Sequence, residues 1–266
     1  MGIGAQSALW RRVALRALSS TYLRRRIRTA DGTCELYVSG GSSLKVLDPR
    51  GVPVDPPHAR FIRDWVGANA VVWDIGCNLG LFAFPAALKA RAGIVYGFEA
   101  DVELAARLLK SRRLPGNTDL NVNIFCLAVS DSDGTASFQI SRFSRAMNRL
   151  SGVGSWNDHK IAADETRSVA TLRIDTLVQS LRPPTAIKID VEGAEMHVLE
   201  GGAATIDKYR PAMLVEGPSE LWEPMGAFFR KHDYVLLDCD VEHPEPLDHP
   251  VWDTLALPRE KYLNRA

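Results

Sequence analysis

Hydrophobic and polar residues alternate in blocks along most of this chain. From about residue 70, short runs rich in valine, isoleucine and aromatic residues are each followed by a longer segment with helical spacing. This alternation predicts an α/β fold in which helices cover both faces of a mostly parallel sheet. The predicted parallel strands are residues 70–76, 94–99, 123–129, 186–190 and 212–217, and the predicted helices are 79–92, 101–113 and 219–231.

Four further segments are predicted as strands outside that rhythm. Residues 135–140 alternate as a half-buried antiparallel strand does, and residues 168–174 are predicted to pair with them. Residues 234–238 and 252–258 are predicted to complete the sheet.

Two segments interrupt the pattern. Residues 34–48 predict a hairpin with a glycine-serine turn that precedes the main sheet. Residues 141–167 are polar and show no period. An irregular stretch of that length within a compact domain is typical of either a disordered segment or a lid over a binding site.

The first 30 residues are basic and contain no acidic residue. Hydrophobic residues recur there at helical spacing from Trp10 to Leu18, so residues 1–33 are predicted to form an amphipathic helical arm packed on the domain. A membrane-surface contact through residues 8–28 and a targeting segment are the alternatives. The arginines concerned are Arg11, Arg12, Arg16, Arg24, Arg25, Arg26 and Arg28.

Composition narrows the class of protein. The 266 residues carry no net charge, which gives no overall field that favours nucleic acid, and no apolar run approaches the length of about 20 residues that spans a bilayer. The four cysteines are far apart, as expected of free thiols in a reducing cytoplasm. We expect one domain over residues 34–266, with a hairpin extension at 34–60 and a core at 70–260.

Carboxylates gather where the predicted parallel strands end. Ligands of open parallel sheets bind beyond the carboxyl ends of the strands. Four of the five strands deliver an acidic side chain at that edge, namely Asp74, Glu99, Asp190 with Glu192, and Glu216. The third strand ends at Ala128 and Val129, with Asp131 close behind. The sequence therefore predicts an acidic ligand site at one edge of the sheet.

The loop after the first strand indicates the ligand. It reads DxGxNxG and not the GxGxxG of a pyrophosphate site, and Asp74 would repel phosphate but attract an amine or a sulfonium. Gly76 and Gly80 would let a ligand approach the backbone, and Glu99 is placed to accept hydrogen bonds from ribose hydroxyls. Ribose with a cationic amino-acid tail describes S-adenosylmethionine. The predicted cofactor residues are Asp74, Gly76, Cys77, Asn78, Gly80, Glu99, Ala128, Val129 and Asp131.

These motifs resemble those of the FkbM-type family of S-adenosylmethionine-dependent methyltransferases. The similar segments are VVWDIGCNLGLF, GFE, LAVSDSDGTASF, TLRIDTL and above all KIDVEGAEMHVLEGG, and the resemblance extends over roughly residues 34–258. Ala100 and Cys77 depart from the family's usual proline and alanine. Neither change removes a side chain needed for ligand contact.

The resemblance implies a Rossmann-like, class I methyltransferase fold with a seven-stranded, mostly parallel sheet whose last strand is antiparallel. It also implies methylation of a hydroxyl on a sugar, glycolipid or secondary metabolite. N-methylation and a non-catalytic binding module are the alternatives. A nucleic-acid substrate is disfavoured, because Asp190-Val191-Glu192-Gly193 offers no aromatic ring to stack on a flipped base.

Asp190 and Glu192 are the predicted catalytic residues. Asp190 follows the strand expected beside the first strand, so it is the candidate to orient or deprotonate the acceptor, while Glu192 is the candidate to bind acceptor hydroxyls. The alternative is that both carboxylates anchor the loop by accepting backbone N–H bonds. Lys188 is predicted to be a charge partner of Asp190.

A metal ion is not part of the prediction. Asp190 and Glu216 could together hold a divalent cation, but two acids are few ligands for one. His197 is expected to be a partly buried packing residue, and His159 is a weak candidate for a base. His243, Asp248 and His249 lie in a proline-rich acidic loop that we expect to be solvated.

Overall fold

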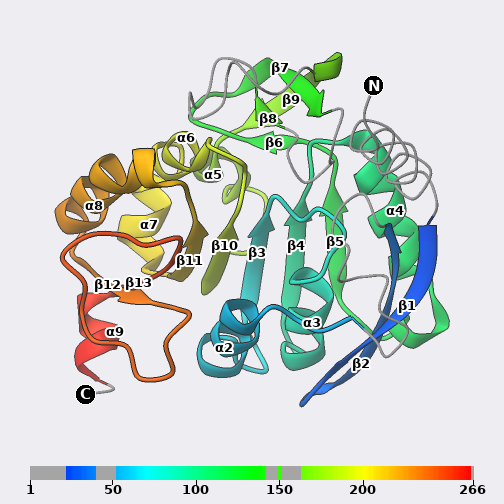
Figure 1. Cartoon of the computed structure of the whole chain (residues 1–266), viewed down its shortest axis with the longest axis horizontal. Coiled ribbons are helices and arrows are strands. Elements are labelled where there is room, and N and C mark those ends of the chain that lie inside the picture. Colours follow the sequence, from blue (N-terminus) through cyan, green and yellow to red (C-terminus); the bar gives the residue numbers. More distant parts are fainter. Residues whose placement is uncertain (1–21, 40–51, 142–148, 151–162, 265–266) are drawn as a thin grey trace, which may run out of the picture.

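A seven-stranded sheet forms the centre of the part of the chain that the computed structural model describes, which is residues 22–39, 52–141, 149–150 and 163–264. The strand order is β12-β13-β11-β10-β3-β4-β5, and β13 alone runs antiparallel to its neighbours (Figure 1). The predicted mostly parallel sheet, with its last strand antiparallel, is confirmed. Its strands are β3 (Val71–Ile75), β4 (Ile94–Phe98), β5 (Val122–Phe125), β10 (Ala186–Ile189), β11 (Ala212–Glu216), β12 (Tyr234–Asp238) and β13 (Asp253–Pro258).

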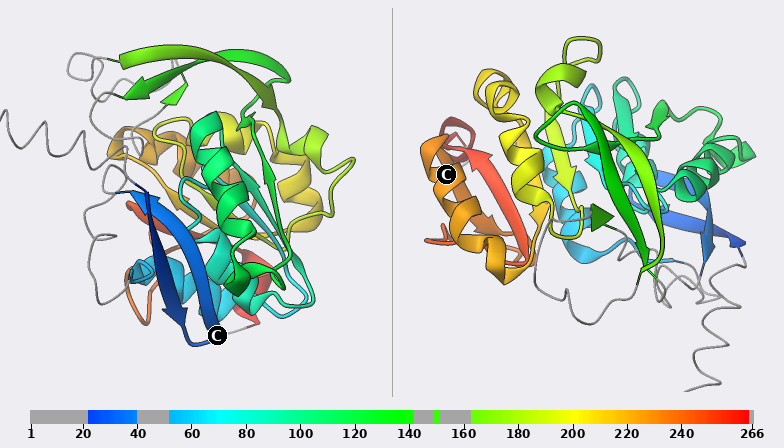
Figure 2. Two further views of the ribbon diagram at one scale, coloured as in Figure 1. Left: turned by 90° about the vertical axis from the view of Figure 1, so that its right-hand side faces the viewer. Right: turned by 90° about the horizontal axis from the view of Figure 1, so that it is seen from above.

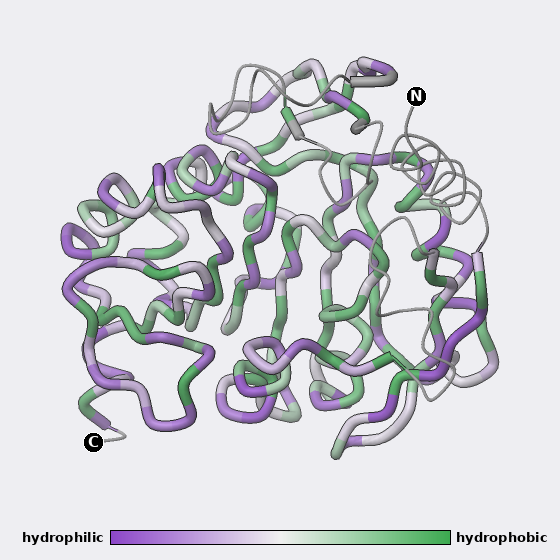
Figure 3. Tube along the Cα trace, in the orientation of Figure 1, coloured by the Kyte–Doolittle hydropathy of each residue, from purple (hydrophilic) through white to green (hydrophobic). Residues whose placement is uncertain are grey.

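Helices cover both faces of this sheet, and each face has its own hydrophobic core. The central strands are apolar on both sides, and every residue of β3 and β4 is buried. One face packs on α2 (Pro56–Trp65), α3 (Ala83–Lys89) and α4 (Val102–Arg112). The other packs on α5 (Ile174–Leu177), α6 (Glu195–Glu200), α7 (Ala203–Tyr209) and α8 (Trp222–Lys231). Hydropathy follows this layering, with mixed colours on the outer helices (Figure 3).

The N-terminal hairpin lies earlier in the chain than predicted. Strands β1 (Tyr22–Thr29) and β2 (Gly32–Ser39) pair antiparallel around a turn at residues 30–31. A hairpin that precedes the main sheet is therefore confirmed, and the predicted end of the helical arm at residue 33 is wrong. Residues 40–48 of the predicted hairpin, with its glycine-serine turn, lie outside the described residues. The alternation of exposed Arg24 and Arg26 with buried Ile27 is a strand pattern, which the concentration of arginines obscured.

The remainder of the predicted N-terminal arm lies outside the described residues. The predicted helix from Trp10 to Leu18 is part of this remainder. Within the predicted membrane-contact segment, residues 22–28 belong to strand β1 and not to an amphipathic helix. In the described ranges, no helix combines the length and hydrophobicity needed to cross a membrane.

The third predicted strand is divided between two sheets. Residues 123–129 were predicted as one strand, but β5 ends at Phe125 and exposed Cys126 precedes β6 (Ala128–Val129), which pairs with β9 (Ala163–Leu172). An exposed residue within the run breaks the continuous burial that a central strand needs.

A second, four-stranded sheet lies beyond the carboxyl ends of the central strands (Figures 1 and 2). Its order is β6-β9-β7-β8, with β7 (Gly134–Ser141) and β8 (Arg149–Leu150) joining the strands already named. The predicted antiparallel pairing of 135–140 with 168–174 is confirmed in its main part, since β9 ends at Leu172. Of the predicted lid, residues 141, 149–150 and 163–167 are strand residues, and 142–148 and 151–162 lie outside the described residues.

Candidate active site

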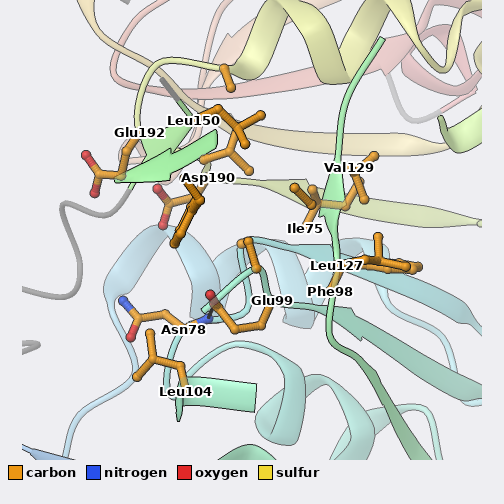
Figure 4. Close-up of a pocket in the computed structure, with 16 residues that line it drawn as sticks. Ile75, Asn78, Phe98, Glu99, Leu104, Leu127, Val129, Leu150, Asp190 and Glu192 are labelled. Carbon is orange, nitrogen blue, oxygen red and sulfur yellow. Dashed lines mark hydrogen bonds between the residues drawn. The ribbon is translucent and has the colours of Figure 1, made fainter. Parts of the chain in front are cut away.

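A pocket of about 610 Å³, part of it open to solvent, lies where the central sheet meets the four-stranded sheet. The loops after β3, β4 and β10 contribute to its lining, together with Leu127, Phe138 and Leu150. Leu150 lies on the side of the site opposite Asn78 (Figure 4). The other lining residues are Ile75, Gly76, Asn78, Phe98, Glu99, Ala100, Leu104, Ala128, Val129, Asp190, Val191, Glu192 and Ala194.

Glu99 is held in a fixed orientation at the end of β4. The backbone N–H of Asn78 donates to Glu99 Oε2 at 2.7 Å, and that of Asp101 donates to Oε1 at 2.8 Å. Burial raises the pKa of Glu99 to about 7, although both backbone hydrogen bonds oppose the shift. Each carboxylate oxygen keeps one lone pair, so the group can still accept hydrogen bonds from a ligand.

Asn78 carries the clearest sign of a missing ligand group. It adopts a positive φ of 49°, and its side-chain Oδ1 is buried without a hydrogen-bond partner among the described residues. Backbone strain and an unsatisfied buried acceptor both cost free energy, and both recur at ligand sites. An amine or hydroxyl donor from a bound molecule would satisfy this oxygen, so the residues present fit S-adenosylmethionine.

The two glycines of the loop serve packing as well. A Cβ on Gly76, which has φ of +83°, would lie 1.7 Å from the carbonyl oxygen of Asp190. A Cβ on Gly80, with φ of +84°, would lie 2.7 Å from the ring of Phe84. Gly76 therefore lets the loops after β3 and β10 touch, whereas Gly80 lets α3 and α4 close behind the pocket.

Asp190 lines the pocket and pairs with a buried lysine. Lys188 Nζ lies 2.8 Å from Asp190 Oδ2 and 3.7 Å from Glu216 Oε1, and the lysine side chain is only 5% exposed. Burial alone would lower the pKa of Lys188, but the charges of Asp190, Glu216 and Asp74 raise it. The predicted charge pairing of Lys188 with Asp190 is confirmed. Since the ammonium already lies between Asp190 and Glu216, the geometry gives no support to a divalent cation there.

Glu192 reaches the pocket from a strained position. It has a positive φ of 54°, which a residue with a Cβ seldom adopts. Burial, followed by the nearby charge of Asp190, raises the pKa of Glu192 to about 8. At neutral pH this side chain is therefore largely a neutral carboxylic acid that can donate a hydrogen bond.

Glu195 anchors the loop in place of Asp190 or Glu192. Its Oε1 accepts hydrogen bonds from the backbone N–H groups of Val191 and Gly193, each at 3.1 Å. This buried carboxylate turns back on the loop that precedes its own helix. The anchoring alternative considered for Asp190 and Glu192 thus describes Glu195, which leaves both of those side chains directed to the pocket.

Four predicted cofactor residues are not among the lining residues. Asp74 is fully buried beside Lys188, and burial raises its pKa. Cys77 and Gly80 lie in the turn below the pocket, and Asp131 Oδ2 lies 2.7 Å from His197 Nδ1. Any effect of these four on a ligand would be indirect, through the loops that they support. Their role in cofactor binding stays a prediction.

The histidines differ in their surroundings. His197 is partly buried, as expected, with about two-fifths of its side chain exposed, and it pairs with Asp131. The ring of His249 stacks on Trp222 at 6.0 Å. His159 lies outside the described residues. His58 of α2, which the sequence did not single out, has its Nε2 2.6 Å from Glu216 Oε1.

Sequence reasoning also missed the apolar part of the site. Phe138 and Leu150 come from the four-stranded sheet, and Phe98 and Leu127 flank the end of β4 and the start of β6. These residues look like ordinary core positions in the sequence. Only the alternation over 135–140, which left one face of that strand without an assigned partner, signalled that something packs there.

Strand order and pocket together define a Rossmann-like site for an adenosyl ligand that carries no phosphate. The Methyltransferase FkbM domain matches residues 66–240, which is more than half of the chain. The chain therefore belongs to the FkbM family of methyltransferases, whose methyl donor is S-adenosylmethionine. The family resemblance seen in the sequence is confirmed.

Two curated relatives are similar over much of this region. The hexuronic acid methyltransferase AglP of Haloferax volcanii is 31% identical over 160 residues, which are 59% of this chain and 59% of that protein. The 2-O-methyltransferase NoeI of Sinorhizobium fredii is 30% identical over 176 residues, which are 62% of this chain and 71% of that protein.

Solved structures resemble this chain more distantly. An FkbM methyltransferase of Methylobacillus flagellatus superposes with a TM-score of 0.49 and 16% identity, covering 76% of this chain and 47% of that one.

Proposed function

We propose that this protein is an S-adenosylmethionine-dependent O-methyltransferase that acts on a hydroxyl of a sugar, a glycolipid or a related metabolite. One observation carries the proposal. Asp190 and Glu99 line one pocket from the ends of two strands that flank β3, so a carboxylate with a lysine partner faces the same space as a carboxylate suited to ribose.

The cofactor half of the pocket is assigned to the loops after β3 and β4. Glu99 would accept hydrogen bonds from ribose hydroxyls, Asn78 Oδ1 would accept one from a donor group, and Ala128 and Val129 would contact the adenine. When bound, S-adenosylmethionine supplies an activated methyl group on a sulfonium sulfur.

The acceptor half is assigned to the loop after β10. Asp190 would accept the proton of the acceptor hydroxyl, and S-adenosylmethionine, when bound, would supply the methyl group to that oxygen. Burial raises the pKa of Asp190, which favours proton uptake, and the charge of Lys188 opposes that shift. Glu192, being largely protonated at neutral pH, donates a hydrogen bond that orients the acceptor.

The class of acceptor is supported by the relatives. One is named for a hexuronic acid, which is a sugar acid, and the other for methylation at a 2-O position. Both names specify or fit an oxygen acceptor. The acidic lining at Asp190 and Glu192 fits an acceptor that offers hydroxyl donors.

Asp190→Asn tests the proposed base. We expect turnover to fall by about 10²-fold or more, because the amide cannot take up the proton. Calorimetry should show the Kd for S-adenosylhomocysteine within about threefold of the parent value, since Asp190 is assigned to the acceptor. Turnover is followed as transfer of labelled methyl to sugars with and without a uronic acid, with amines as the comparison. Full activity of the variant would remove Asp190 from the mechanism.

The unmodified protein provides the broader test. Thermal-shift measurements should show stabilisation by S-adenosylhomocysteine and none by NAD. Binding without methyl transfer to any cell extract would favour a binding module, and a product labelled on nitrogen would favour N-methylation.

A further inference from the structure

A histidine outside the matched family domain contacts the charged groups behind the pocket. His58 lies on α2, before the matched residues 66–240 begin. Its Nε2 lies 2.6 Å from Glu216 Oε1 at the end of β11, and its ring packs edge-on against Phe82 at 5.5 Å. The side chain is about nine-tenths buried. Such a contact links a helix at the rim of the sheet to the strand ends.

From Glu216 the contacts continue to the pocket. The same oxygen, Oε1, lies 3.7 Å from Lys188 Nζ, and that nitrogen lies 2.8 Å from Asp190 Oδ2. Of these four residues, Asp190 alone is among the lining residues of the pocket. A continuous set of polar contacts thus leads from α2 to the proposed base.

The direction of the first hydrogen bond is fixed by charge. Burial would raise the pKa of Glu216, but the charge of Lys188 and the hydrogen bond from His58 outweigh it and lower the pKa to about 2. An ionised carboxylate can only accept, so His58 donates through Nε2. Its Nδ1 is buried and has no hydrogen-bond partner among the described residues. The polar contact of this ring is therefore the one with Glu216.

Lys188 is shared unequally between two carboxylates. It contacts Asp190 closely and Glu216 at a longer distance, and His58 donates to the Glu216 oxygen that faces the lysine. Without this donor, Glu216 would become a stronger competitor for the ammonium, because a buried carboxylate that loses a hydrogen bond gains more from an ion pair. Lys188 would then move toward Glu216 and away from Asp190.

We propose, on the basis of the proposed function above, that His58 is a positioning residue which holds Glu216 so that Lys188 stays directed at Asp190. It touches neither cofactor nor acceptor and acts through two intermediate side chains. The titratable groups that face Asp190 from the elements around it are Lys188, Glu216, His58, Asp74, Glu192, Glu195 and, behind Glu216, Asp253.

Two substitutions at residue 58 separate positioning from packing. The amide nitrogen of Gln occupies nearly the same place as histidine Nε2, so His58→Gln keeps the donor to Glu216, whereas His58→Leu keeps bulk and removes the donor. In His58→Leu we expect kcat to fall about tenfold with the Kd for S-adenosylhomocysteine unchanged within about twofold. In His58→Gln we expect kcat within about threefold of the parent.

The pH dependence is the more specific measurement. When Lys188 moves away, the charged form of Asp190 loses stabilisation, so the acid limb of the kcat profile moves to higher pH in His58→Leu and stays in place in His58→Gln. A residue that only packs would lower kcat without moving this limb. Equal impairment of both variants, or an unmoved limb in His58→Leu, would overturn the proposal.

A measurement that needs no acceptor keeps the proposal independent of the proposed function. NMR of protein labelled with ¹³C at the aspartate carboxyl carbons, assigned with Asp190→Asn, reports the Asp190 titration directly. We expect it at higher pH in His58→Leu than in the parent and in His58→Gln. An unchanged titration overturns the role of His58 even if the enzyme is active. A shifted titration in a protein that transfers no methyl group supports the positioning and contradicts the function.

Discussion

Two glutamates near this site differ in protonation state because their neighbours differ. The pKa of Glu216 is lowered to about 2 and that of Glu192 is raised to about 8, although both follow strands of the same sheet. The difference arises because burial is opposed at Glu216 by Lys188 and His58, whereas at Glu192 the nearby charges of Asp190, Glu195 and Glu216 add to burial. Chemical role is therefore decided at the residue scale by contacts from other elements.

Glu99 gives a prediction about pH. Because burial raises its pKa to about 7, the carboxylate gains a proton as the pH falls through neutrality and loses acceptor strength toward ribose hydroxyls. We expect the Kd for S-adenosylhomocysteine to rise about fivefold between pH 7 and pH 6, as for one group with a pKa near 7. Calorimetry across this range measures it.

Two variants show whether Glu99 is responsible for the pH dependence of the Kd. Glu99→Ala should weaken S-adenosylhomocysteine binding at every pH and flatten this pH dependence. Glu192→Gln, which alters the acceptor half of the pocket, should leave the pH dependence as in the parent. The same shift has the opposite sign for the stability of the free protein. The folded state holds the Glu99 proton more tightly than the unfolded chain, so this group's contribution to the free energy of unfolding falls from about pH 4.5 to about pH 7. An unchanged Kd in Glu99→Ala would contradict the ribose assignment.

At the scale of elements, the site depends on close contact between the loops after β3 and β10. The backbone of Asp190 donates to the carbonyl of Ile75 at 3.0 Å, and the carbonyl of Asp190 occupies the space where Gly76 lacks a Cβ. Glu195 holds the second loop through two backbone N–H groups. The orientation of Asp190 is thus fixed by backbone packing as well as by Lys188.

Gly76→Ala is expected to be severely destabilising. The added Cβ would lie 1.7 Å from a carbonyl oxygen at a φ of +83°, which forces the loops apart, and we expect the free energy of unfolding to fall by about 3 kcal/mol or more. Gly67→Ala is the matched control, because nothing lies within 4 Å of its Cβ position, and should change the value by less than about 1 kcal/mol. Urea unfolding of both variants measures this difference. Equal stabilities would contradict the close contact between Gly76 and the Asp190 carbonyl.

At the scale of the whole molecule, the buried amide of Asn117 helps to attach the N-terminal hairpin to the domain, beside a hydrogen bond from the N–H of Tyr37 to Ser111 Oγ at 3.0 Å. Asn117 Nδ2 donates to the carbonyl oxygens of Glu35 and Ser111 at 2.6 and 2.7 Å, and its Oδ1 accepts from the N–H of Glu35 at 3.0 Å. The backbone of β2 at Glu35 thereby completes its hydrogen bonding against the segment after α4. Ile27 and Leu36 of the hairpin extend the core formed by α3 and α4.

Asn117→Ala should loosen this attachment. Both backbone groups of Glu35 would lose their partner, and we expect the free energy of unfolding to fall by about 3 kcal/mol. Hydrogen exchange over residues 32–39 should rise as well. Thr118→Ala is the neighbouring control, since its exposed hydroxyl donates to the Pro115 carbonyl and to no other group in the described part of the chain, and it should lie within about 0.5 kcal/mol of the parent. If both variants behave alike, the amide does not tie the hairpin down.

The sequence by itself determined the layered α/β fold, the parallel strands and the carboxylates at their ends. Continuous apolar runs, turn signals and the DxGxNxG loop are local features, and a parallel sheet places all its carboxyl ends at one edge. That loop together with Glu99 indicated the cofactor, and the family motifs added the antiparallel last strand. The position of the hairpin at residues 22–39 was not predicted, because its strand alternation lies within a dense run of arginines.

Only the tertiary structure decided which groups meet. Glu195, and not Asp190 or Glu192, anchors the loop after β10; Asp74 lies beneath the pocket; and His58 reaches Glu216 across 158 positions of sequence. The four-stranded sheet that closes the pocket likewise depends on pairing between β6 and β9, far apart in the chain. Such contacts depend on the packing of α2 and on how loops cross a strand edge, and neither leaves a period or a motif in the sequence.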